Sequence, residues 1–263
     1  MVFVLLTLLI AATFAVFAPR WLSLPLMRRP RPMAVTASQR VGVVTTFVPQ
    51  VESTEMLERT VAAMVAMEYP HETWVLDEGN HARIRAICAR LGARHFTRLD
   101  KPQYREPSGP YAVGTKYGNY NAWLDAIGYE YCDVVVAFDP DHVPAVDFLE
   151  RTLGYFEDPD VGYVQSAQAY YNQRASFVAR GAAEETYVYY SSIQMSGFGI
   201  GYPVITGCHN AHRTAALRDL GGFAPHDGDD LLLTLLYRES PWKGVYVPEK
   251  LASGLTPVDW RSY

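Results

Sequence analysis

Short apolar runs alternate with apolar residues at helical spacing along most of this chain. Runs bounded by polar residues, such as Val134–Phe138, predict strands that are buried on both faces. The expected strands are residues 41–47, 73–76, 134–138, 161–165 and 245–247, and the expected helices are one that begins at Ser53 or Thr54 and ends by Tyr69-Pro70, then 84–91, 116–127, 146–156, 175–195, 214–220 and 231–237. This alternation predicts an α/β fold with a parallel sheet and right-handed crossovers.

Two segments break the alternation. Residues 98–115 form a long polar stretch with three prolines, and loops of that length are usually functional or disordered. Residues 197–201 read G-x-G-x-G, which resembles a dinucleotide-binding loop, but they follow a predicted helix and precede Pro203. The strand–turn–helix context of a dinucleotide site is therefore missing.

The chain begins with an apolar segment. Val2–Ala18 carries no charge, and its length is at the short end of a bilayer span. Pro19 and Arg20 come directly after it, and Arg28, Arg29 and Arg31 follow, whereas a signal peptide has its positive charges before the apolar run. We therefore favour a membrane anchor over a signal peptide or a buried helix, and the positive-inside rule places the remaining chain in the cytosol. The predicted organisation is a transmembrane helix at 1–19, a basic, proline-rich linker at 20–39 and a globular domain at 40–263.

Composition narrows the class of protein. The chain has 263 residues, of which 49% are hydrophobic, and this is enough material for one large domain with a core. Its formal net charge of -5 excludes a typical nucleic-acid-binding protein. The three cysteines (Cys88, Cys132 and Cys208) are far apart and form neither a CxxC pair nor a zinc spacing, which suits a reducing cytosolic compartment.

Two carboxylates follow the predicted central strand. Asp139 and Asp141 flank Pro140 directly after Phe138. Open α/β sheets bind ligands beyond the carboxyl ends of their strands, so both side chains are expected at a ligand site. Clustered carboxylates repel each other unless a cation neutralises them, and Mg²⁺ or Mn²⁺ prefers such oxygen ligands together with phosphates. The D-x-D therefore indicates a metal–diphosphate site, with a solvated acidic turn as the alternative.

Further carboxylates stand at other element ends. Asp77 ends the second predicted strand, and Asp229 and Asp230 precede the helix at 231–237. Each alone is typical of a helix cap or a solvated turn. Together with Asp139 and Asp141 they fall where a parallel sheet would gather them at one edge. His209 and His212 are interpreted as hydrogen-bonding residues in a loop rather than as metal ligands.

The order of these motifs resembles the family 2 glycosyltransferases, in particular the processive, cellulose-synthase-like branch. The resemblance runs from Val41 to Tyr263 and rests on several stretches. These are Thr46 and Glu52 after the first strand, Asp77, the K-x-G-N-x-N at 116–121, the D-x-D with the following His142-Val143-Pro144, the segments 207–209 and 212–213, and Gly221-Gly222-Phe223 before Gly228-Asp229-Asp230. The spacing between Thr46 and Glu52 is longer than in the family, and Asp229 replaces the glutamate of the family's T-E-D.

The resemblance implies a GT-A fold, with a mostly parallel sheet flanked by helices, and a role for each matching residue. Asp230 is implied as the general base, and Asp139 and Asp141 as the holders of Mg²⁺ or Mn²⁺. The implied donor-binding residues are Thr46, Glu52, Asp77 (on the uracil), Lys116 and Asp139, and the candidates for the acceptor site are Asp229, Cys208 and His209. The implied partners are a UDP-sugar donor, a glycan acceptor and the lipid bilayer, with no nucleic acid, and the implied location is the cell membrane with the catalytic domain in the cytoplasm.

The family also has a Q-x-x-R-W, which caps the acceptor site, followed by membrane helices. It is expected shortly after Arg261, but the sequence ends at Tyr263. The resemblance therefore predicts that the catalytic domain at 40–263 lacks its C-terminal part. The expected reaction is inverting, metal-dependent transfer of a sugar from a UDP-sugar to a hydroxyl of a growing polysaccharide or other glycan. The alternatives are a non-catalytic membrane-tethered scaffold and a haloacid-dehalogenase-like phosphatase, which also places a D-x-D after a buried strand.

Overall fold

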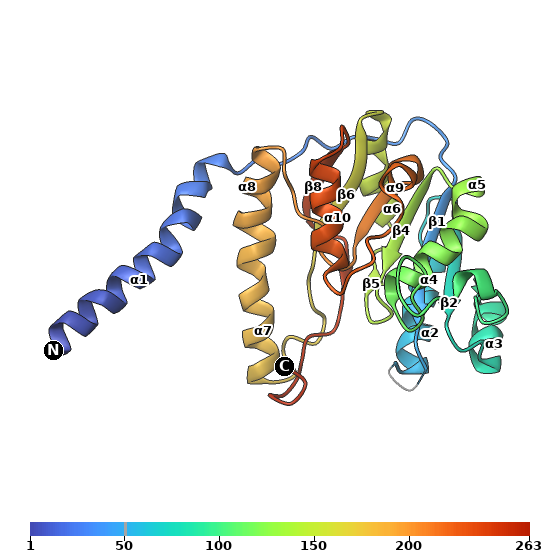
Figure 1. Ribbon diagram of the computed structural model, residues 1–263, viewed down its shortest axis with the longest axis horizontal. Coiled ribbons are helices and arrows are strands. Elements are labelled where there is room, and N and C mark those ends of the chain that lie inside the picture. The colour runs from blue at the N-terminus through green and yellow to red at the C-terminus, as the bar shows by residue number, and fades with distance from the viewer. Residues whose placement is uncertain (50–51) are drawn as a thin grey trace.

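A seven-stranded sheet forms the centre of the molecule in the computed structural model, which describes residues 1–49 and 52–263 (Figure 1). The strand order is β3-β2-β1-β4-β7-β6-β8. The strands are β1 (Val41–Phe47), β2 (Glu72–Asp77), β3 (Arg94–Phe96), β4 (Val134–Phe138), β6 (Val161–Ala167), β7 (Asn210–Arg213) and β8 (Lys243–Lys250), and a separate pair is formed by β5 (Val143–Pro144) and β9 (Ala252–Ser253). All neighbours in the large sheet are parallel except β7, which runs antiparallel to β4 and β6. The predicted parallel sheet is thus confirmed except for β7.

Both faces of the sheet are covered, as the unbroken apolar runs predict. Val134 and Val136 of β4 point to a core built with α2 (Thr54–Val65) and α6 (Phe148–Leu153). Val135 and Ala137 point to the opposite core, built with α4 (Lys116–Trp123), α9 (Thr214–Leu220) and α10 (Asp229–Arg238). A third cluster lies between β1, β2, α2 and α3 (Ala82–Leu91). Burial on both faces explains why alternation is absent from these strands.

Most helix boundaries agree with the sequence. Ser53 caps α2 by accepting from the amide of Met56, and Gly92 ends α3 in the left-handed conformation. The helix expected at 116–127 is longer, because α4 continues through a π-helical turn, η3 (Leu124–Gly128), into α5 (Tyr129–Tyr131). The helix expected at 146–156 is shorter: α6 is followed by a 3₁₀ turn, η4 (Gly154–Glu157).

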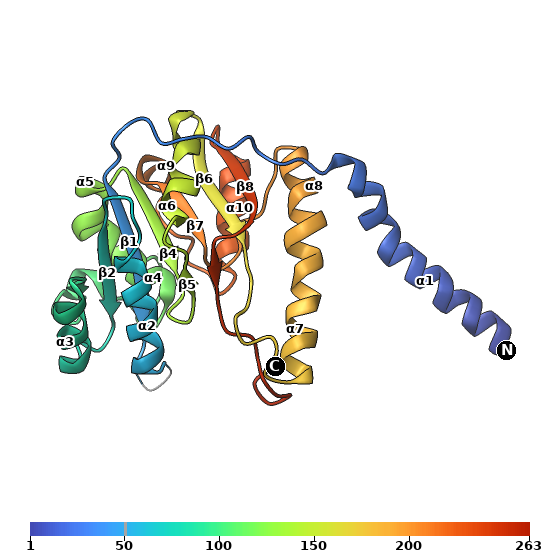
Figure 2. The same ribbon diagram turned by 180° about the vertical axis from the view of Figure 1, so that it is seen from behind.

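The long helix expected at 175–195 is present but is interrupted by a π-helical turn. It consists of α7 (Phe177–Val188), η5 (Tyr189–Ile193) and α8 (Gln194–Gly199). The glycines of the G-x-G-x-G stretch therefore lie at the end of a helix, and this confirms that the stretch is not a dinucleotide loop. Figures 1 and 2 show the helix standing beside the β8 side of the domain.

The prediction that His209 and His212 lie in a loop is wrong for His212. It lies in β7, and His209 immediately precedes this strand. The sequence of β7, Asn210–Arg213, is too short and polar to resemble a strand, because its pairing is imposed by its position between β4 and β6. The strands β3, β5 and β9 escaped prediction because they are only two or three residues long, too short for a pattern.

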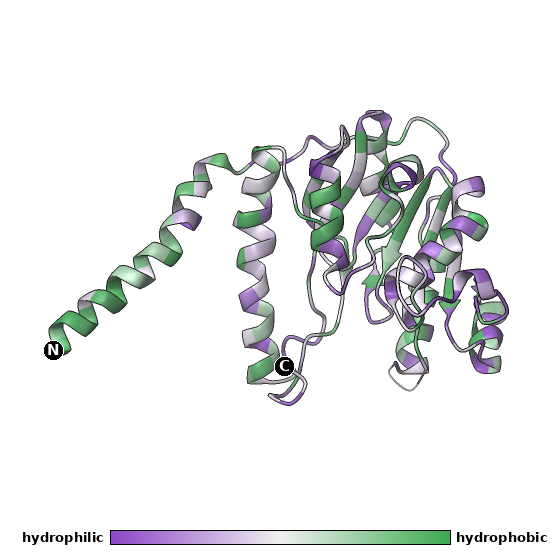
Figure 3. Ribbon diagram, in the orientation of Figure 1, coloured by the Kyte–Doolittle hydropathy of each residue, from purple (hydrophilic) through white to green (hydrophobic). Residues whose placement is uncertain are grey.

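The N-terminal apolar segment is a helix that projects from the domain (Figures 1 and 3). This helix, α1 (Val2–Ser23), continues through Pro19, beyond the end predicted at residue 19, into the 3₁₀ turn η1 (Leu24–Leu26). Within the described residues, Val2–Leu26 is the single helical segment long and apolar enough to cross a membrane, with a mean hydropathy of 2.5 in its most apolar window. None of that window is buried in the protein.

The linker that follows η1 lies against the domain (Figure 2). The amide of Arg28 donates to the Met195 carbonyl at 3.1 Å. Close packing needs glycine at two positions: a Cβ on Gly199 would lie 1.7 Å from the Leu26 carbonyl oxygen, and one on Gly154 would lie 1.9 Å from that of Met33. Further along, a Glu157 carboxylate oxygen accepts from two linker amides, those of Thr36 and Ala37, at 2.9 Å each.

Candidate active site

A cavity of about 520 Å³ opens beyond the carboxyl ends of β1 and β4. The residues that line it come from the ends of β1, β2 and β4, the start of α2, the loop before α4, the first turns of α4 and the segment after β9. They are Thr46, Val48, Glu52, Met56, Glu78, Gly114, Thr115, Lys116, Asn119, Asp139, Pro140, Asp141 and Leu255. Five of the residues predicted to bind donor or metal are therefore brought together. This is the edge of the sheet at which α/β folds bind ligands.

Asp139 is held by a cation from another element. The Lys116 ammonium donates to the Asp139 carboxylate and, at 2.9 Å, to the carbonyl oxygen of Gly207. Burial raises the pKa of Asp139, but the charges of Lys116 and His142 outweigh it and lower that pKa to about 2. Burial likewise lowers the pKa of Lys116, and Asp139 reverses this and raises it. The pair is therefore ionised at neutral pH, and the ammonium borders the cavity.

Asp141 has a different set of partners. Its carboxylate accepts from the amide of Leu255 at 3.3 Å and lies 2.8 Å from Nδ1 of His142. Ligand atoms of Asp139, Asp141 and His142 all lie within 4.8 Å of one another. Two carboxylates this close are hard oxygen donors of the kind that Mg²⁺ and Mn²⁺ prefer. The residues present therefore fit a divalent ion.

Asp77 ends β2 but does not line the cavity among the described residues. Its side chain is fully buried and accepts from the amides of Gly79 and His81. Its oxygens also contact the imidazoles of His81, at 3.2 Å, and His95, at 3.0 Å. Burial raises the pKa of Asp77, and these hydrogen bonds outweigh that and hold the pKa below its ordinary value. Asp77 thus shapes the turn after β2 rather than presenting its carboxylate to the cavity.

Glu52 and Thr46 stand at the end of β1. Glu52 accepts from the amide of Val48 at 2.7 Å, and this hydrogen bond closes the turn after the strand. Burial and, to a smaller extent, the charges of Asp139 and Asp141 raise the pKa of Glu52 to about 7. A group with this pKa exchanges its proton near neutral pH, so it responds to any cation bound between the two aspartates.

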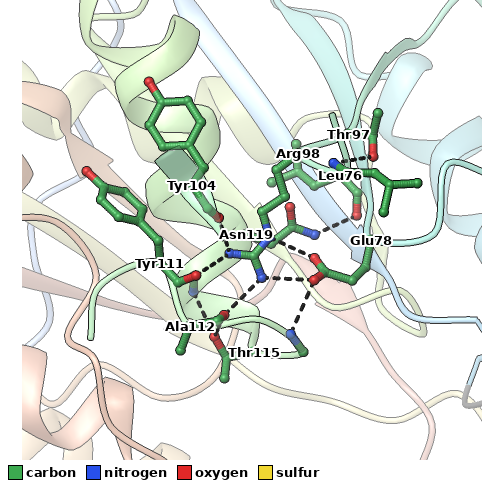
Figure 4. A network of polar contacts seen from close by, with 12 residues as sticks. Leu76, Glu78, Thr97, Arg98, Tyr104, Tyr111, Ala112, Thr115 and Asn119 are labelled. Atoms are coloured by element: carbon green, nitrogen blue, oxygen red, sulfur yellow. Dashed lines mark hydrogen bonds and ion pairs between the residues drawn. The ribbon is translucent and has the colours of Figure 1, made fainter. Parts of the chain in front are cut away.

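The polar loop at 98–115 is organised around one buried arginine (Figure 4). Arg98 is fully buried and uses all five N–H donors. Two of them reach the Glu78 carboxylate, at 2.8 and 3.1 Å, and the others reach the backbone carbonyls of Tyr104, Tyr111 and Ala112 at 2.9 to 3.2 Å. Glu78 in turn accepts from the amide of Gly114 at 3.2 Å. The loop is therefore fixed at its C-terminal end, where it leads into Lys116.

The K-x-G-N-x-N at 116–121 starts α4, and each of its small or amide residues has a structural reason. A Cβ on Gly118 would lie 2.3 Å from the Ala112 carbonyl oxygen, so glycine lets the helix approach the loop. Asn119 donates to the Leu76 carbonyl at 3.0 Å and lines the cavity. Asn121 donates to the carbonyl of Phe223 and accepts from its amide. The motif thus joins the loop, β2 and the segment before α10.

Asp230 lies in the first turn of α10 and is linked to the cavity through Gly207. Its Oδ2 accepts from the Gly207 amide at 2.9 Å, while the carbonyl of the same glycine accepts from Lys116. Gly207 has φ +52°, a conformation that favours glycine. Asp229 accepts from the amide of Asp230, and its partly buried position raises its pKa. Asp230 and Asp139 are therefore joined through one ammonium and one glycine.

Cys208 and His209, predicted for the acceptor site, are fully buried. Burial raises the pKa of the Cys208 thiol well above its ordinary value, and burial lowers the pKa of His209 to about 3. His212 is also fully buried, and burial lowers its pKa to about 3 as well. All three side chains are therefore uncharged at neutral pH, and none presents an exposed surface.

Two residues of the site were missed at the sequence level. Arg98 lies in a loop whose composition indicates exposure, and nothing in the sequence marks it as buried. Glu78 follows Asp77 directly, and successive residues at a strand end point to opposite sides. Which of the two carboxylates lines the cavity depends on the neighbouring loop, so the sequence alone does not indicate Glu78.

Comparison with known proteins gives a consistent family. A family model described as glycosyltransferase-like family 2 matches residues 41–263. Cellulose synthase 2 of Novacetimonas hansenii is 27% identical over 245 residues, which are 89% of this chain and 14% of the relative. The UDP-forming cellulose synthase 1 catalytic subunit of Komagataeibacter xylinus is 25% identical over 241 residues, 88% of this chain and 30% of the relative. The chain thus spans less than a third of these relatives.

Solved structures share the fold. A mannosyltransferase from Pyrobaculum calidifontis in complex with GDP-Man and Mn²⁺ has a TM-score of 0.69 at 18% identity, with 94% of this chain and 68% of that chain covered. Glucosyl-3-phosphoglycerate synthase from Mycobacterium tuberculosis, in complex with Mn²⁺, UDP and phosphoglyceric acid, has a TM-score of 0.56 at 20% identity, with 89% and 80% covered. These likenesses show the predicted GT-A fold, and the family match favours a glycosyltransferase over the phosphatase alternative.

Proposed function

The chain belongs to glycosyltransferase-like family 2, and from this membership we propose that it is a membrane-anchored, inverting glycosyltransferase that uses a UDP-sugar. The proposed acceptor is a hydroxyl of a growing polysaccharide or other glycan. The donor nucleotide and the glycan product are suggested by the relatives, which include a UDP-forming cellulose synthase subunit. One observation carries the proposal: Asp139, Lys116, Gly207 and Asp230 form a continuous series of contacts beside one cavity.

The cavity supplies the parts of a donor site. Asp139 and Asp141 would hold Mg²⁺ or Mn²⁺, which neutralises a diphosphate leaving group when bound. The Lys116 ammonium, which donates to Asp139 in the structure, can bind the diphosphate as a second positive charge beside the metal ion. Thr46 and Glu52 face the same space from β1. Asp77 supports the donor side from behind, through the turn that it fixes with Gly79 and His81.

We assign Asp230 as the general base. Its carboxylate is positioned by the amides of Gly207 and Leu231, at 2.9 and 2.7 Å, so its orientation is set before substrate arrives. In the proposed step Asp230 takes the proton of the acceptor hydroxyl while that oxygen bonds to the anomeric carbon. The bond from the anomeric carbon to the diphosphate oxygen breaks, and UDP leaves with that electron pair. Asp229, Cys208 and His209 stay candidates for shaping the acceptor side, the latter two through their backbone.

The decisive experiment separates chemistry from binding at Asp230. We expect Asp230→Asn in the full-length protein to lower turnover by about a hundredfold to ten-thousandfold, the usual contribution of general acid–base catalysis. UDP affinity, measured by calorimetry with Mn²⁺, should stay near that of the parent because the base acts on the acceptor. Asn caps a helix about as well as Asp, so a purely structural role would leave turnover intact.

Asp227→Asn is the matched control, because Asp227 is exposed and lies just before the same helix. It should leave both turnover and UDP affinity unchanged. Near-normal turnover of Asp230→Asn would refute the assignment of the base, and Asp229 would be the next residue to test. A parent protein that binds UDP but transfers no sugar would support the non-catalytic scaffold instead.

The anchor is part of the proposal. We infer that α1 spans the cell membrane and that residues from Arg20 onward face the cytoplasm, where UDP-sugars are made. The support is the apolar, unburied helix followed by arginines. Protease protection in sealed vesicles tests the orientation. A domain that is protected in right-side-out vesicles but cut in inverted ones agrees with the proposal. The reverse pattern would contradict it.

A further inference from the structure

A second group of potential metal ligands lies directly behind the carboxylate pair. It consists of His142, Cys208 and His209, which we call the imidazole–thiol cluster. One ligand atom from each lies within 4.8 Å of the other two. Cys208 and His209 are fully buried and His142 is 6% exposed, so water does not compete at this place. The rings of His142 and His209 meet edge to face, with centroids 4.6 Å apart.

His209 has an unused ligand atom in this cluster. Its Nδ1 lies 3.5 Å from the carbonyl oxygen of Ala167, which fixes that nitrogen as the protonated one. Its Nε2 is buried and has no hydrogen-bond partner within residues 1–49 and 52–263. A buried polar atom without a partner is costly, and such atoms are rare in folded proteins. The backbone of His209 also has φ +60°, which is uncommon for a residue other than glycine.

Two imidazoles and a thiol differ chemically from the neighbouring aspartates. Carboxylates select Mg²⁺ and Mn²⁺, whereas thiolate and imidazole ligands select Zn²⁺. We propose that the imidazole–thiol cluster is a Zn²⁺ site, separate from the Mg²⁺ or Mn²⁺ site of Asp139 and Asp141. The two sites adjoin at His142, whose Nδ1 lies 2.8 Å from the Asp141 carboxylate, whereas Cys208 and His209 belong to the imidazole–thiol cluster alone. The inference rests on the proposed function only for the name of the neighbouring site.

A Zn²⁺ ion here would connect two segments that are far apart in the sequence. His142 belongs to the turn between β4 and β5, and Cys208 and His209 belong to the segment that starts at Gly207. Gly207 contacts both Lys116 and Asp230. His142 lies 2.8 Å from Asp141, and a carboxylate beside a ligating histidine is the usual support of a zinc ligand. The ion would therefore fix the segment that joins the proposed base to the donor side.

The test uses the full-length protein in detergent, stripped of metal and then supplied with excess Mg²⁺ to saturate the carboxylate pair. Calorimetric titration with Zn²⁺ should give one bound ion per chain. Co²⁺ in its place should give a thiolate-to-cobalt charge-transfer band in the near ultraviolet, which reports the sulfur ligand directly. Cys208→Ser should abolish that band and weaken Zn²⁺ binding at least tenfold, whereas Cys88→Ser and Cys132→Ser, which change the other two buried cysteines, should keep both.

Two further variants keep the outcome decisive. His209→Asn should also lose Zn²⁺, and asparagine tolerates the left-handed backbone at this position, so the variant is expected to fold. Asp139→Asn should lose Mn²⁺-dependent UDP binding but keep Zn²⁺. The proposal is overturned if the parent protein takes up no stoichiometric Zn²⁺, if Cys208→Ser keeps the cobalt band, or if Asp139→Asn removes Zn²⁺ as well, since the ion would then belong to the carboxylate pair.

Discussion

Two carboxylates at the same edge of the sheet, on either side of β1, have opposite kinds of partner. Asp77 at the end of β2 is fully buried, and its four partners are two backbone amides and two imidazoles of its own segment and of β3. Asp139 just beyond β4 faces the cavity, and its main partner is the ammonium of Lys116 from α4. Both have a pKa below the ordinary value despite burial, but for different causes.

The difference teaches how to tell a structural carboxylate from a working one. Backbone amides cannot leave Asp77 without unfolding the turn, so its hydrogen bonds are permanent. A lysine side chain can swing away from Asp139 and be replaced by a metal ion and a phosphate. A strand-end carboxylate whose partner is a mobile cation is therefore the better candidate for ligand binding, even where both carboxylates are ionised.

The largest expected effect compares the two aspartates as ligands. Asp139→Asn should weaken Mn²⁺-dependent UDP binding about 100-fold or more, because a direct metal ligand matters at least as much as its supporting groups. Asp77→Asn should weaken it by less than about tenfold, since Asp77 acts through the turn that it holds. Calorimetry with UDP, with and without Mn²⁺, measures both. An equally large loss in Asp77→Asn would break the comparison and favour the direct contact with uracil that the family resemblance implies.

The second prediction concerns stability, where the order should reverse. Asp77→Ala leaves two backbone amides and two imidazoles without their shared, fully buried acceptor and should lower the free energy of unfolding by about 3 kcal/mol. Asp139→Ala frees a lysine that can turn to solvent, so the cost should be at most about 1 kcal/mol. Urea unfolding of the detergent-solubilised protein, followed by tryptophan fluorescence, gives both values. Equal losses would show that the Lys116 pair is as structural as Asp77.

The third prediction extends the comparison to another strand end, that of β1. Burial raises the pKa of Glu52 from 4.5 to about 7, so between these values the folded state binds more protons than the unfolded state. The contribution of Glu52 to stability is thus fully present below pH 4.5 and is lost as the pH rises through 7. Glu52→Gln should remove this loss. Urea unfolding at pH 5 and pH 8 tests it, and an unchanged pH slope in the variant would contradict the raised pKa.

The fold was largely predictable because its main elements are local. A few consecutive residues are enough to predict each of several features. These are the apolar runs of β1 and β4, which are buried on both faces, the cap at Ser53 and the helix end at Gly92. By contrast, β7 is a strand only because β4 and β6 lie on either side of it. The π-helical turn η5 is similarly absent from the helical periodicity, because one extra residue per turn barely alters it over five residues.

The site was predictable in its residues but not in its contacts. Strand-end rules and the family resemblance indicated Asp139, Lys116 and Asp230, but the glycine that joins them became visible only in the structure. Arg98 escaped notice because a buried guanidinium depends on carbonyl groups that only the folded loop supplies. Sequence patterns indicate burial through apolar residues, so they do not reveal a buried charged residue around which a loop is arranged.

The docked linker determines how rigidly the domain is held relative to α1. Backbone hydrogen bonds at Arg28, Thr36 and Ala37, and close contacts at Gly154 and Gly199, leave little slack between α1 and the sheet. With α1 in a bilayer, as proposed, the domain would be connected rigidly to the membrane helix rather than by a flexible linker. The cavity would then keep a fixed distance from the lipid surface and a fixed orientation to it. An acceptor chain would therefore always approach the cavity from the same direction.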